Sequence, residues 1–301
     1  MNKIIIIAGP TGVGKTASSI ALAKALNGEI ISADSMQIYK GMDIGTAKIT
    51  EEEKAGVVHH LLDVVDPKDE FSVSDFDKMA TEAINDIIKR GKTPIVVGGT
   101  GLYINSLIYK MDYNNVSSDE TLRAELWDFY EKNGEDALYD MLLELDSEPN
   151  VEKQNIKRVI RAIEILKNGG KKDAFIAIPK RDEWLPELIV LHRDRENLYE
   201  IINKRVDLMM EQGLLYEVNK FLEIGLTKNN QSMKAIGYRQ ILSYLEGEMD
   251  LEAAIDLIKR DSRRYAKRQL TWFRRYENAK WINVDGLDLE GIINQILVDK
   301  K

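Results

Sequence analysis

Eight residues near the start of the chain have the composition and spacing of a phosphate-binding loop. The segment GPTGVGKT matches the pattern G-x-x-x-x-G-K-[ST] and separates an aliphatic run, residues 4–8, from a stretch rich in alanine and leucine. Glycines let backbone N–H groups converge on anionic oxygens, and a helix that begins at the loop adds partial positive charge. The predicted diphosphate ligands are Gly9, Pro10, Thr11, Gly12, Val13, Gly14, Lys15 and Thr16.

Two side chains of this loop have separate chemical tasks. Lys15 is expected to reach the terminal phosphates, and the hydroxyl of Thr16 is a suitable ligand for Mg²⁺. We therefore predict Mg²⁺ as the cofactor and Thr16 as its ligand. The loop alone indicates a diphosphate or a triphosphate and does not separate a kinase from another class of transferase.

One carboxylate follows a predicted strand and could face the phosphate loop. The apolar run at residues 29–33 is followed at once by Asp34. Ligands of open α/β sheets bind at the carboxyl ends of the strands, so we expect Asp34 to line the same site. The run at residues 93–97 ends instead in GGTG, which offers no acid to support a metal ion. Its position alone makes Asp34 either a support for the metal or a general base.

The segments around these residues predict an α/β fold with a parallel sheet and helices on both faces. A helix rich in alanine and leucine is expected at residues 15–26 and an amphipathic helix at residues 74–90, between the first strands. Strands that alternate with helices favour a parallel sheet with right-handed crossovers. The runs with the composition of strands are residues 4–8, 29–33, 93–97, 187–192 and 281–284.

The character of the sequence changes in the middle of the chain. Strand-like runs are absent there, and three polar helices are predicted, at residues 120–132, 136–145 and 152–166. We read this stretch as an inserted all-helical domain. The predicted division is a core of residues 1–113 and 185–301 and an insertion of residues 114–184.

Bulk composition narrows the class of protein. The 301 residues are 44% hydrophobic and 31% charged, which is typical of a folded domain. The absence of cysteine excludes disulfides and thiolate catalysis. No apolar run approaches the ~20 residues that span a bilayer, so we expect a cytoplasmic protein with no membrane partner. The net charge of −8 argues at first sight against nucleic acid, although the local distribution of charge decides.

A basic segment near the C-terminus departs from this acidic average. Residues 259–275 hold eight Lys or Arg and one acid, Asp261. In a helix the cations lie opposite an apolar face, and a charged face is usually just solvated. A face of nearly one sign in an acidic protein favours contact with the phosphates of a nucleic acid.

The order of motifs along the chain resembles that of the tRNA dimethylallyltransferases, also called tRNA isopentenyltransferases. The motifs are GPTGVGKT, ISADSMQIYKGMDIGTAK, HHLLDVVDP, FSVSDF, PIVVGGTGLYI, RVIRAIE, RVDLMMEQGL, KAIGYRQ and KRQLTWFR. This resemblance spans nearly the whole chain. It implies a P-loop kinase-like core with a helical insertion, and transfer of a dimethylallyl group from its diphosphate to N6 of adenosine 37 in tRNA. The implied partners are dimethylallyl diphosphate and a tRNA anticodon stem-loop, and we expect a monomer.

The resemblance also implies roles for individual residues. Asp34 matches the base that takes a proton from the attacking amine, and Thr16 and Arg205 complete the implied catalytic set, with Arg205 on the diphosphate. Gln37 could bond two base-edge atoms at once, once the base has left its stack. The implied tRNA contacts are Asp34, Ser35, Met36, Gln37, Thr100, Arg123, Lys157, Arg158, Arg161, Lys234, Gly237, Tyr238, Arg239, Arg264, Lys267 and Arg268. Arg158 and Arg161 could instead pair with a neighbouring acid such as Glu164.

Three other functions stay open at this point. An adenylate isopentenyltransferase acting on free AMP, ADP or ATP would need neither the insertion nor the basic segment. A nucleotide kinase should carry an acid after residue 97 and an arginine-rich lid. A non-enzymatic RNA-binding module would have no use for Asp34 beside an intact phosphate loop.

Overall fold

The computed structural model describes residues 2–111, 119–149, 151–169 and 179–298. The chain forms two compact units, a larger one of Met1–Ile108 with Arg181–Lys301 and a smaller one of Tyr109–Lys180. Of the domain boundaries drawn from the sequence, the one at 113/114 lies outside the described residues. The other, at 184/185, falls at the start of a strand of the larger unit.

The larger unit is built on a parallel sheet, as the sequence predicts. Its six described strands have the order β3-β2-β4-β1-β5-β6, and every neighbouring pair is parallel. The strands are β1 (Asn2–Ala8), β2 (Gly28–Ala33), β3 (His59–His60), β4 (Thr93–Gly98), β5 (Trp184–His192) and β6 (Lys280–Asn283). Only β3 was not predicted, because two histidines give no strand pattern.

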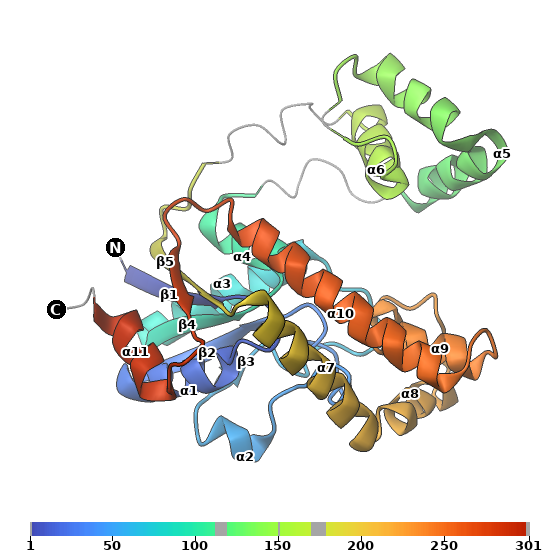
Figure 1. Cartoon of the computed structure of the whole chain (residues 1–301). Helices are drawn as coiled ribbons and strands as arrows, with labels where there is room; N and C mark the ends of the chain where they lie inside the picture. Colours follow the sequence, from blue (N-terminus) through green and yellow to red (C-terminus); the bar gives the residue numbers. More distant parts are fainter. Residues whose placement is uncertain (1, 112–118, 150, 170–178, 299–301) are drawn as a thin grey trace. The chain divides into compact units, whose positions relative to one another are not determined.

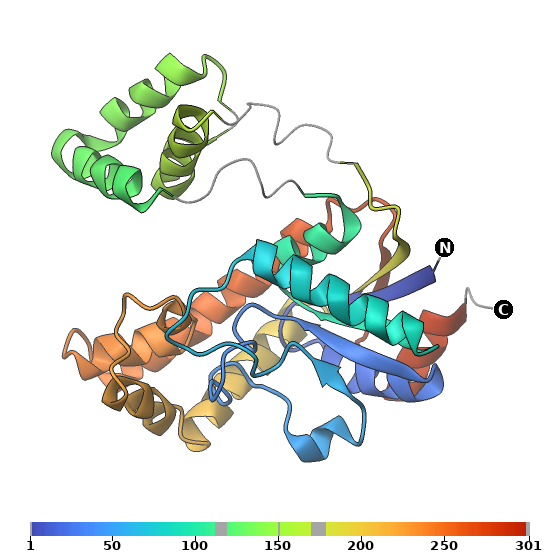
Figure 2. The ribbon, with the colours of Figure 1, turned by 180° about the vertical axis from the view of Figure 1, so that it is seen from behind.

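Helices cover both faces of this sheet, which confirms the predicted layering. Figures 1 and 2 show α1 and α11 on one face and α3 on the other. The described α-helices of the larger unit are α1 (Lys15–Ala25), α2 (Glu51–Lys54), α3 (Val73–Lys89), α4 (Gly101–Ile108), α7 (Arg195–Glu211), α8 (Leu214–Glu223), α9 (Tyr238–Leu245), α10 (Leu251–Phe273) and α11 (Leu289–Leu297).

Local signals in the sequence explain where the helices nearest the site begin. Helix α1 begins after Gly14, whose φ of 84° lies in the left-handed region that favours glycine. Helix α3 begins with a capping box, in which Ser72 and Asp75 each accept a hydrogen bond from the other's backbone N–H. Helix α10 is capped by Asp250, whose side chain accepts from the N–H of Ala253. These signals fix the helix ends independently of tertiary packing.

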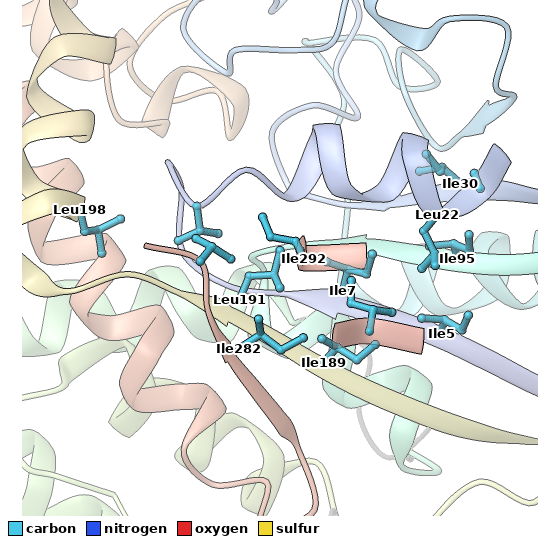
Figure 3. Packing of buried hydrophobic residues seen from close by; sticks show 14 of the residues in the cluster. Ile5, Ile7, Leu22, Ile30, Ile95, Ile189, Leu191, Leu198, Ile282 and Ile292 are labelled. Carbon is cyan, nitrogen blue, oxygen red and sulfur yellow. The ribbon is translucent and has the colours of Figure 1, made fainter. Parts of the chain in front are cut away.

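Aliphatic side chains from neighbouring strands form the core under α1 and α11. Figure 3 shows Ile5, Ile7 and Ile189 of the central strands beside Leu22 of α1 and Ile292 of α11. Burial of each such side chain contributes roughly 1.5–3 kcal/mol. This packing holds the carboxyl ends of β1 and β4, where the phosphate loop and the GGTG segment begin, in fixed register.

The smaller unit is helical, as predicted, in the part that is described. Helix α5 (Glu120–Leu145) combines the first two predicted helices across a kink at Gly134, and α6 (Ile156–Lys167) is the third. The unit has an apolar core of its own, formed by Leu126, Leu138, Leu142, Val159, Ile160 and Ile163. The described residues include no helix that is long and apolar enough to span a membrane.

The two ends of the smaller unit are paired with each other through the backbone. Tyr109 and Lys180 form an antiparallel bridge, and the N–H of Lys110 donates to the carbonyl of Pro179 at 2.8 Å. Next to them, the N–H of Arg181 donates to the carbonyl of Ile108 at 2.9 Å. We call this paired segment the neck. Its existence means that the chain leaves the larger unit and returns to it at one place.

Candidate active site

A cavity of about 890 Å³ opens at the carboxyl edge of β1, β2 and β4, and all of its lining residues belong to the larger unit. The phosphate loop, the segment that follows β2, and helices α7 and α10 form its walls. The predicted site residues that line it are Thr11, Gly12, Gly14, Lys15, Thr16, Asp34, Ser35, Met36, Gln37, Arg205, Lys234, Arg239 and Arg268. The edge is the one at which parallel α/β sheets bind their ligands.

Two further residues of the phosphate loop, Val13 and Gly9, pack against the core and against β5. Val13 is fully buried in the core, so only its backbone can face a ligand. Gly9 has a φ of 146°, and a Cβ at this position would clash with the carbonyl oxygen of Leu191 on β5. The loop therefore depends on glycine at this position because the backbone of β5 lies directly against it.

Among the described residues, Lys15 has no anionic hydrogen-bond partner. Its Nζ donates to the carbonyl oxygens of Gly9 at 2.9 Å and Pro10 at 2.7 Å. The pKa of Lys15 is lowered to about 8, chiefly by burial; the charge of Asp34 opposes this shift, and the charge of Arg205 adds to it. The ammonium is thus held in a partly desolvated position where an anion would favour its charged form.

Arg205 of α7 is the second desolvated cation of the cavity. Burial lowers the pKa of its guanidinium, and the nearby Asp34 opposes that shift. Its Nε is buried and has no hydrogen-bond partner among the residues that the structure describes. A buried donor without a partner is rare in proteins. Lys15 and Arg205 together have the donor set that a diphosphate requires.

The Asp34 carboxylate is held by the turn that follows it. Its Oδ1 accepts from the N–H of Met36 at 2.9 Å and of Gln37 at 3.3 Å. Within the described parts of the chain, Oδ2 makes no hydrogen bond, and Asp34 lines the cavity. Asp34 influences the pKa values of both Lys15 and Arg205, so the carboxylate and the two cations form one electrostatic unit.

The two-point contact of Gln37 with a base edge is not preformed. Its Nε2 already donates to the carbonyl oxygens of Thr46 at 3.2 Å and Ala47 at 3.4 Å. The amide therefore has one fixed orientation, in which the nitrogen belongs to the wall of the cavity and the oxygen remains an acceptor. The sequence could not reveal this because Thr46 and Ala47 give no pattern that distinguishes their carbonyls.

Thr100 lies behind Ser35 and is not among the residues that line the cavity. Its Oγ1 accepts from the N–H of Ser35 at 3.0 Å and lies 3.4 Å from the Ser35 hydroxyl. The side chain thus fixes the start of the segment after β2. Its expected contact with tRNA stays a prediction.

The KAIGYR segment divides into exposed and buried residues. Lys234 and Arg239 are exposed and line the cavity, whereas Gly237 is buried. The side chain of Tyr238 is fully buried, and its hydroxyl donates to Glu217. The Tyr238 ring is thus enclosed by protein, and the expected contact of this residue with tRNA stays a prediction.

Residues 259–273 of the basic segment lie in α10, and the cations of the segment differ in their partners. Lys259 pairs with Asp207 at 2.5 Å, and Arg260 lies 3.4 Å from Asp261. Arg264 and Lys267 are exposed and form no salt bridge with the described residues, and the guanidinium of Arg268 lies 5.6 Å from the centre of the Tyr265 ring. The three predicted contacts, Arg264, Lys267 and Arg268, form no ion pair with a described acid, and the same holds for Arg263, Arg274 and Arg275 of this segment.

Some of the predicted RNA contacts of the smaller unit are likewise paired with an acid, and others are exposed. Arg123 and Arg161 pair with Glu164 at 3.1 and 2.8 Å. Burial pushes the pKa of Glu164 up, but hydrogen bonds from Arg161, the Asp119 backbone and Arg123 outweigh it and hold that pKa below its usual value. The ion pair considered in the sequence is therefore formed by Arg161, while Lys157 and Arg158 are exposed.

Sequence reasoning missed three side chains that organise the cavity. Gln269 of α10 donates to the carbonyl of Gly99 at 2.9 Å and accepts from the N–H of Thr11 at 3.4 Å, so it ties α10 to the phosphate loop. Burial raises the pKa of Tyr265 to about 12, and the charge of Asp34 adds to the shift. Glu217 of α8 holds the backbone of residues 43–45. Gln269 and Tyr265 lie in the basic segment, where the cations drew attention, and nothing in the pattern marks Glu217.

For the predicted Mg²⁺, the described residues offer the hydroxyl of Thr16 at the cavity wall. The described residues contain no cluster of three His, Asp or Glu side chains that could hold a metal ion by itself. Mg²⁺ at phosphate sites typically keeps several waters and takes one or two protein ligands together with phosphate oxygens. The exposed Thr16 at the cavity wall fits that mode of binding.

Comparisons with known proteins agree over nearly the whole chain. A family model described as IPP transferase matches residues 37–276. The tRNA dimethylallyltransferase of Alkaliphilus oremlandii is 51% identical over 304 residues, covering 99% of this chain and 97% of that protein. The protein of the same name from Clostridioides difficile is 51% identical over 98% of this chain and 96% of its own length.

Two solved structures give the same result in three dimensions. The tRNA isopentenylpyrophosphate transferase of Bacillus halodurans has a TM-score of 0.77 at 46% identity, covering all of this chain and 96% of its own. A eukaryotic dimethylallyltransferase acting on tRNA has a TM-score of 0.79 at 31% identity, covering 95% of this chain and 75% of its own. By its sequence and its fold, this chain belongs to the IPP transferase family.

Proposed function

We propose that this chain transfers a dimethylallyl group from dimethylallyl diphosphate to the exocyclic N6 of adenosine 37 in tRNA, with release of diphosphate. The observation that carries the proposal is the cavity in which the phosphate loop, two desolvated cations and the Asp34 carboxylate lie together. Relatives with half of their residues identical are named tRNA dimethylallyltransferases, which supports the same activity.

Departure of diphosphate is the step in which negative charge develops, on the oxygen that leaves C1 of the donor. Backbone N–H groups of the loop, the ammonium of Lys15 and the guanidinium of Arg205 would bind the departing oxygens. Arginine suits this task because its planar fork can bind two oxygens at once. Mg²⁺, held by the Thr16 hydroxyl, would add positive charge at the same oxygens when bound.

The acceptor nitrogen forms its bond with C1 as the C1–O bond breaks. A carboxylate is a weak base toward a neutral aryl amine, so the proton leaves only after the nitrogen has begun to bond and has become acidic. Oδ2 of Asp34 would take this proton, while Oδ1 stays bound to the turn. The products are N6-dimethylallyl adenosine, diphosphate and a proton on Asp34 that later passes to water.

Unpaired cations support an RNA substrate with a phosphate backbone. Lys234 and Arg268 line the cavity, and the exposed Arg264 and Lys267 continue the positive surface along α10. Exposed Lys157 and Arg158 give the smaller unit a similar surface. We propose a tRNA anticodon stem-loop as the partner of these residues and a monomer as the working state.

The kinase alternative is disfavoured by the end of β4. Many phosphate-loop enzymes support Mg²⁺ with an acid on a second strand. A Cβ at Gly98 would clash with the backbone of Ala33 on β2, so the close approach of these strands leaves no room for a side chain there. The free-nucleotide alternative is disfavoured by the unpaired cations of α10, which a mononucleotide would not need.

One assay separates these functions. Labelled dimethylallyl diphosphate is supplied with either an adenine-containing anticodon stem-loop or AMP, and ATP with nucleosides serves as the kinase control. We expect label to pass to the stem-loop, and Asp34→Asn to abolish transfer with RNA affinity retained within about threefold. Asp34→Asn is preferable to Asp34→Ala because the amide oxygen can still accept from Met36 and Gln37. Transfer to AMP alone, or phosphorylation by ATP, would overturn the proposal.

A further inference from the structure

Glu217 is a buried carboxylate that no step of the proposed reaction uses. It lies on α8 and is 7% exposed. Its Oε2 accepts from the N–H groups of Asp43 at 3.0 Å and Ile44 at 2.8 Å, and its Oε1 accepts from that of Gly45 at 3.0 Å. The Tyr238 hydroxyl donates to Oε1 as well. Four donors thus converge on one side chain, which is the capacity of an ionised carboxylate.

The backbone held by Glu217 forms part of the cavity wall. Asp43, Ile44 and Gly45 all line the cavity, as do the residues that follow them up to Thr50. A Cβ at Gly45 would clash with the Tyr238 ring, so the loop lies directly on that ring. Tyr238 therefore has a role at the site despite its burial, as the support beneath this loop.

The same loop continues to the carbonyl groups that orient Gln37. The N–H of Ala47 donates to the carbonyl of Ile44 at 2.9 Å, so the turn is closed on the segment that Glu217 holds. The carbonyls of Thr46 and Ala47 in turn accept from the amide of Gln37. A continuous chain of hydrogen bonds leads from Glu217 through the backbone to the residue expected to read the base.

We propose that Glu217, with Tyr238, is a positioning residue that sets the orientation of Gln37 and thereby the placement of the acceptor base beside Asp34. The proposal rests on the proposed function, because it assigns a task to Gln37 within that reaction. Glu217 acts only through the loop of residues 43–47 and touches neither diphosphate nor base. We call the hydrogen bonds from the backbone of residues 43–45 and from Tyr238 to Glu217 the clamp. The clamp is present in the protein without any substrate.

Glu217→Gln tests the proposal because an amide has only one accepting oxygen. In either orientation its NH₂ group would face at least one backbone N–H, which loses its acceptor in a buried site. We expect kcat/KM for the stem-loop to fall by about tenfold or more, while pyrophosphate affinity changes by less than about twofold. Glu223→Gln, an exposed carboxylate on the same helix, serves as the matched control and is expected to leave both quantities unchanged.

A double-mutant cycle distinguishes positioning from a general loss of structure. Because Glu217 acts through Gln37, the loss caused by Glu217→Gln should be much smaller in a Gln37→Ala background. If the double substitution lowers kcat/KM by the product of the two single factors, the residues act independently and the proposal is overturned. An unchanged kcat/KM in a folded Glu217→Gln protein would overturn it as well.

If the Glu217→Gln protein does not fold, hydrogen exchange in the unaltered protein and in the Tyr238→Phe protein still tests the proposal. The amides of Asp43, Ile44 and Gly45 should exchange slowly, and Tyr238→Phe should speed the exchange of Gly45 most, because the two donors share Oε1. Exchange as fast as that of an exposed loop would overturn the clamp. This measurement and the pyrophosphate affinity need no turnover, so absence of transfer by the unaltered protein would count against the proposed function and not against the clamp.

Discussion

Two desolvated cations that make no hydrogen bond to a described acid distinguish this cavity. The buried carboxylate of Glu29, in contrast, is bonded to Arg90, Lys92 and His60. Lys15 instead donates to carbonyl oxygens, and Arg205 leaves Nε without a partner among the described residues. Desolvated cations of this kind favour an anionic ligand, because binding restores the electrostatic partner that folding removed.

The lowered pKa of Lys15 predicts how diphosphate binding depends on pH. The free site holds this pKa near 8, whereas a bound anion favours the charged form and raises it again. Above about pH 8, pyrophosphate binding is therefore coupled to uptake of a proton by Lys15. Below that pH Lys15 is already protonated, so its titration should not affect the affinity. Above that pH we expect affinity to weaken by up to about tenfold per pH unit.

Calorimetric titration with pyrophosphate between about pH 7 and pH 9.5 checks this expectation. Lys15→Arg is the matched control, since a guanidinium does not titrate in this range and the ligand's own protonation affects both proteins equally. Identical pH profiles for the two proteins would show that Lys15 stays charged throughout, contrary to the prediction.

At this scale the sequence predicted the residues that belong to local patterns and missed those defined by distant contacts. The phosphate loop and Asp34 could be found because a motif and a strand end identify them. Glu217 meets its backbone partners across 172 to 174 positions of the chain, and Gln269 meets Thr11 across 258. No pattern within one segment records such contacts. The orientation of the Gln37 amide was missed for a different reason, because the carbonyls of Thr46 and Ala47, although only 9 and 10 positions away, give no distinguishing pattern.

Among the elements, helix α10 carries two different functions on its two sides. Ala254, Ile258, Ala266 and Phe273 are buried, and they fix the helix on the core. Its outer face holds cations of which some are paired with acids and some are not. The sequence could predict the amphipathic helix, but not this division, because the acids come from other elements as well as from α10 itself.

The unpaired cations of α10 should dominate the salt dependence of RNA binding. Arg264→Ala combined with Lys267→Ala is expected to weaken binding and to lower the slope of log affinity against log salt by about two, one for each phosphate that is no longer neutralised. Lys259→Ala, on the same helix but paired with Asp207, should change the slope by much less. Fluorescence anisotropy of a labelled stem-loop at several salt concentrations measures both. Equal effects in the two proteins would contradict the assignment.

The start of β2 is stabilised by a buried carboxylate, Glu29. The hydrogen bond from Arg90, with help from Lys92 and His60, outweighs the effect of burial and holds the pKa of Glu29 far below its usual value. A depressed carboxyl pKa adds stability that is complete above the unfolded value of 4.5 and is lost as the pH falls toward the folded value. The bonds of Glu29 to His60, Arg90 and Lys92 join β2 to β3 and to the segment before β4.

Glu29→Gln should therefore destabilise the protein at neutral pH. We expect a loss of about 1–3 kcal/mol, below the value for a fully buried pair because Arg90 and Lys92 keep part of their side chains in solvent. Urea unfolding at pH 7 measures the difference, which should shrink as the pH falls below about 4.5. A difference that stays constant over this range would mean that the charge of Glu29 contributes nothing.

The whole molecule consists of two units, each with an apolar core of its own. The core under α1 and α11 belongs to the larger unit, and that between α5 and α6 to the smaller. The cavity lies entirely in the larger unit, whereas predicted RNA contacts occur in both. Diphosphate binding should thus require only the core of the larger unit, whereas RNA binding should require the cores of both units.

Matched substitutions in the two cores test this division. Leu138→Ala in the smaller unit and Leu22→Ala in the larger one each remove a fully buried side chain, at a cost of about 2–5 kcal/mol. Leu138→Ala should leave pyrophosphate affinity within about twofold and weaken stem-loop binding by about tenfold, while Leu22→Ala should weaken both. Calorimetry and anisotropy on the same preparations provide the two readouts. Loss of pyrophosphate binding in the Leu138→Ala protein would show that the two cores are not independent.

The paired neck has a consequence for how such a protein could have arisen. Backbone bonds between Lys110 and Pro179 and between Ile108 and Arg181 bring the point of departure and the point of return side by side. A gene segment could enter or leave there by recombination without any change in strand order. Such an event would add the exposed Lys157 and Arg158 in one step, while the cations of α10 already belong to the larger unit.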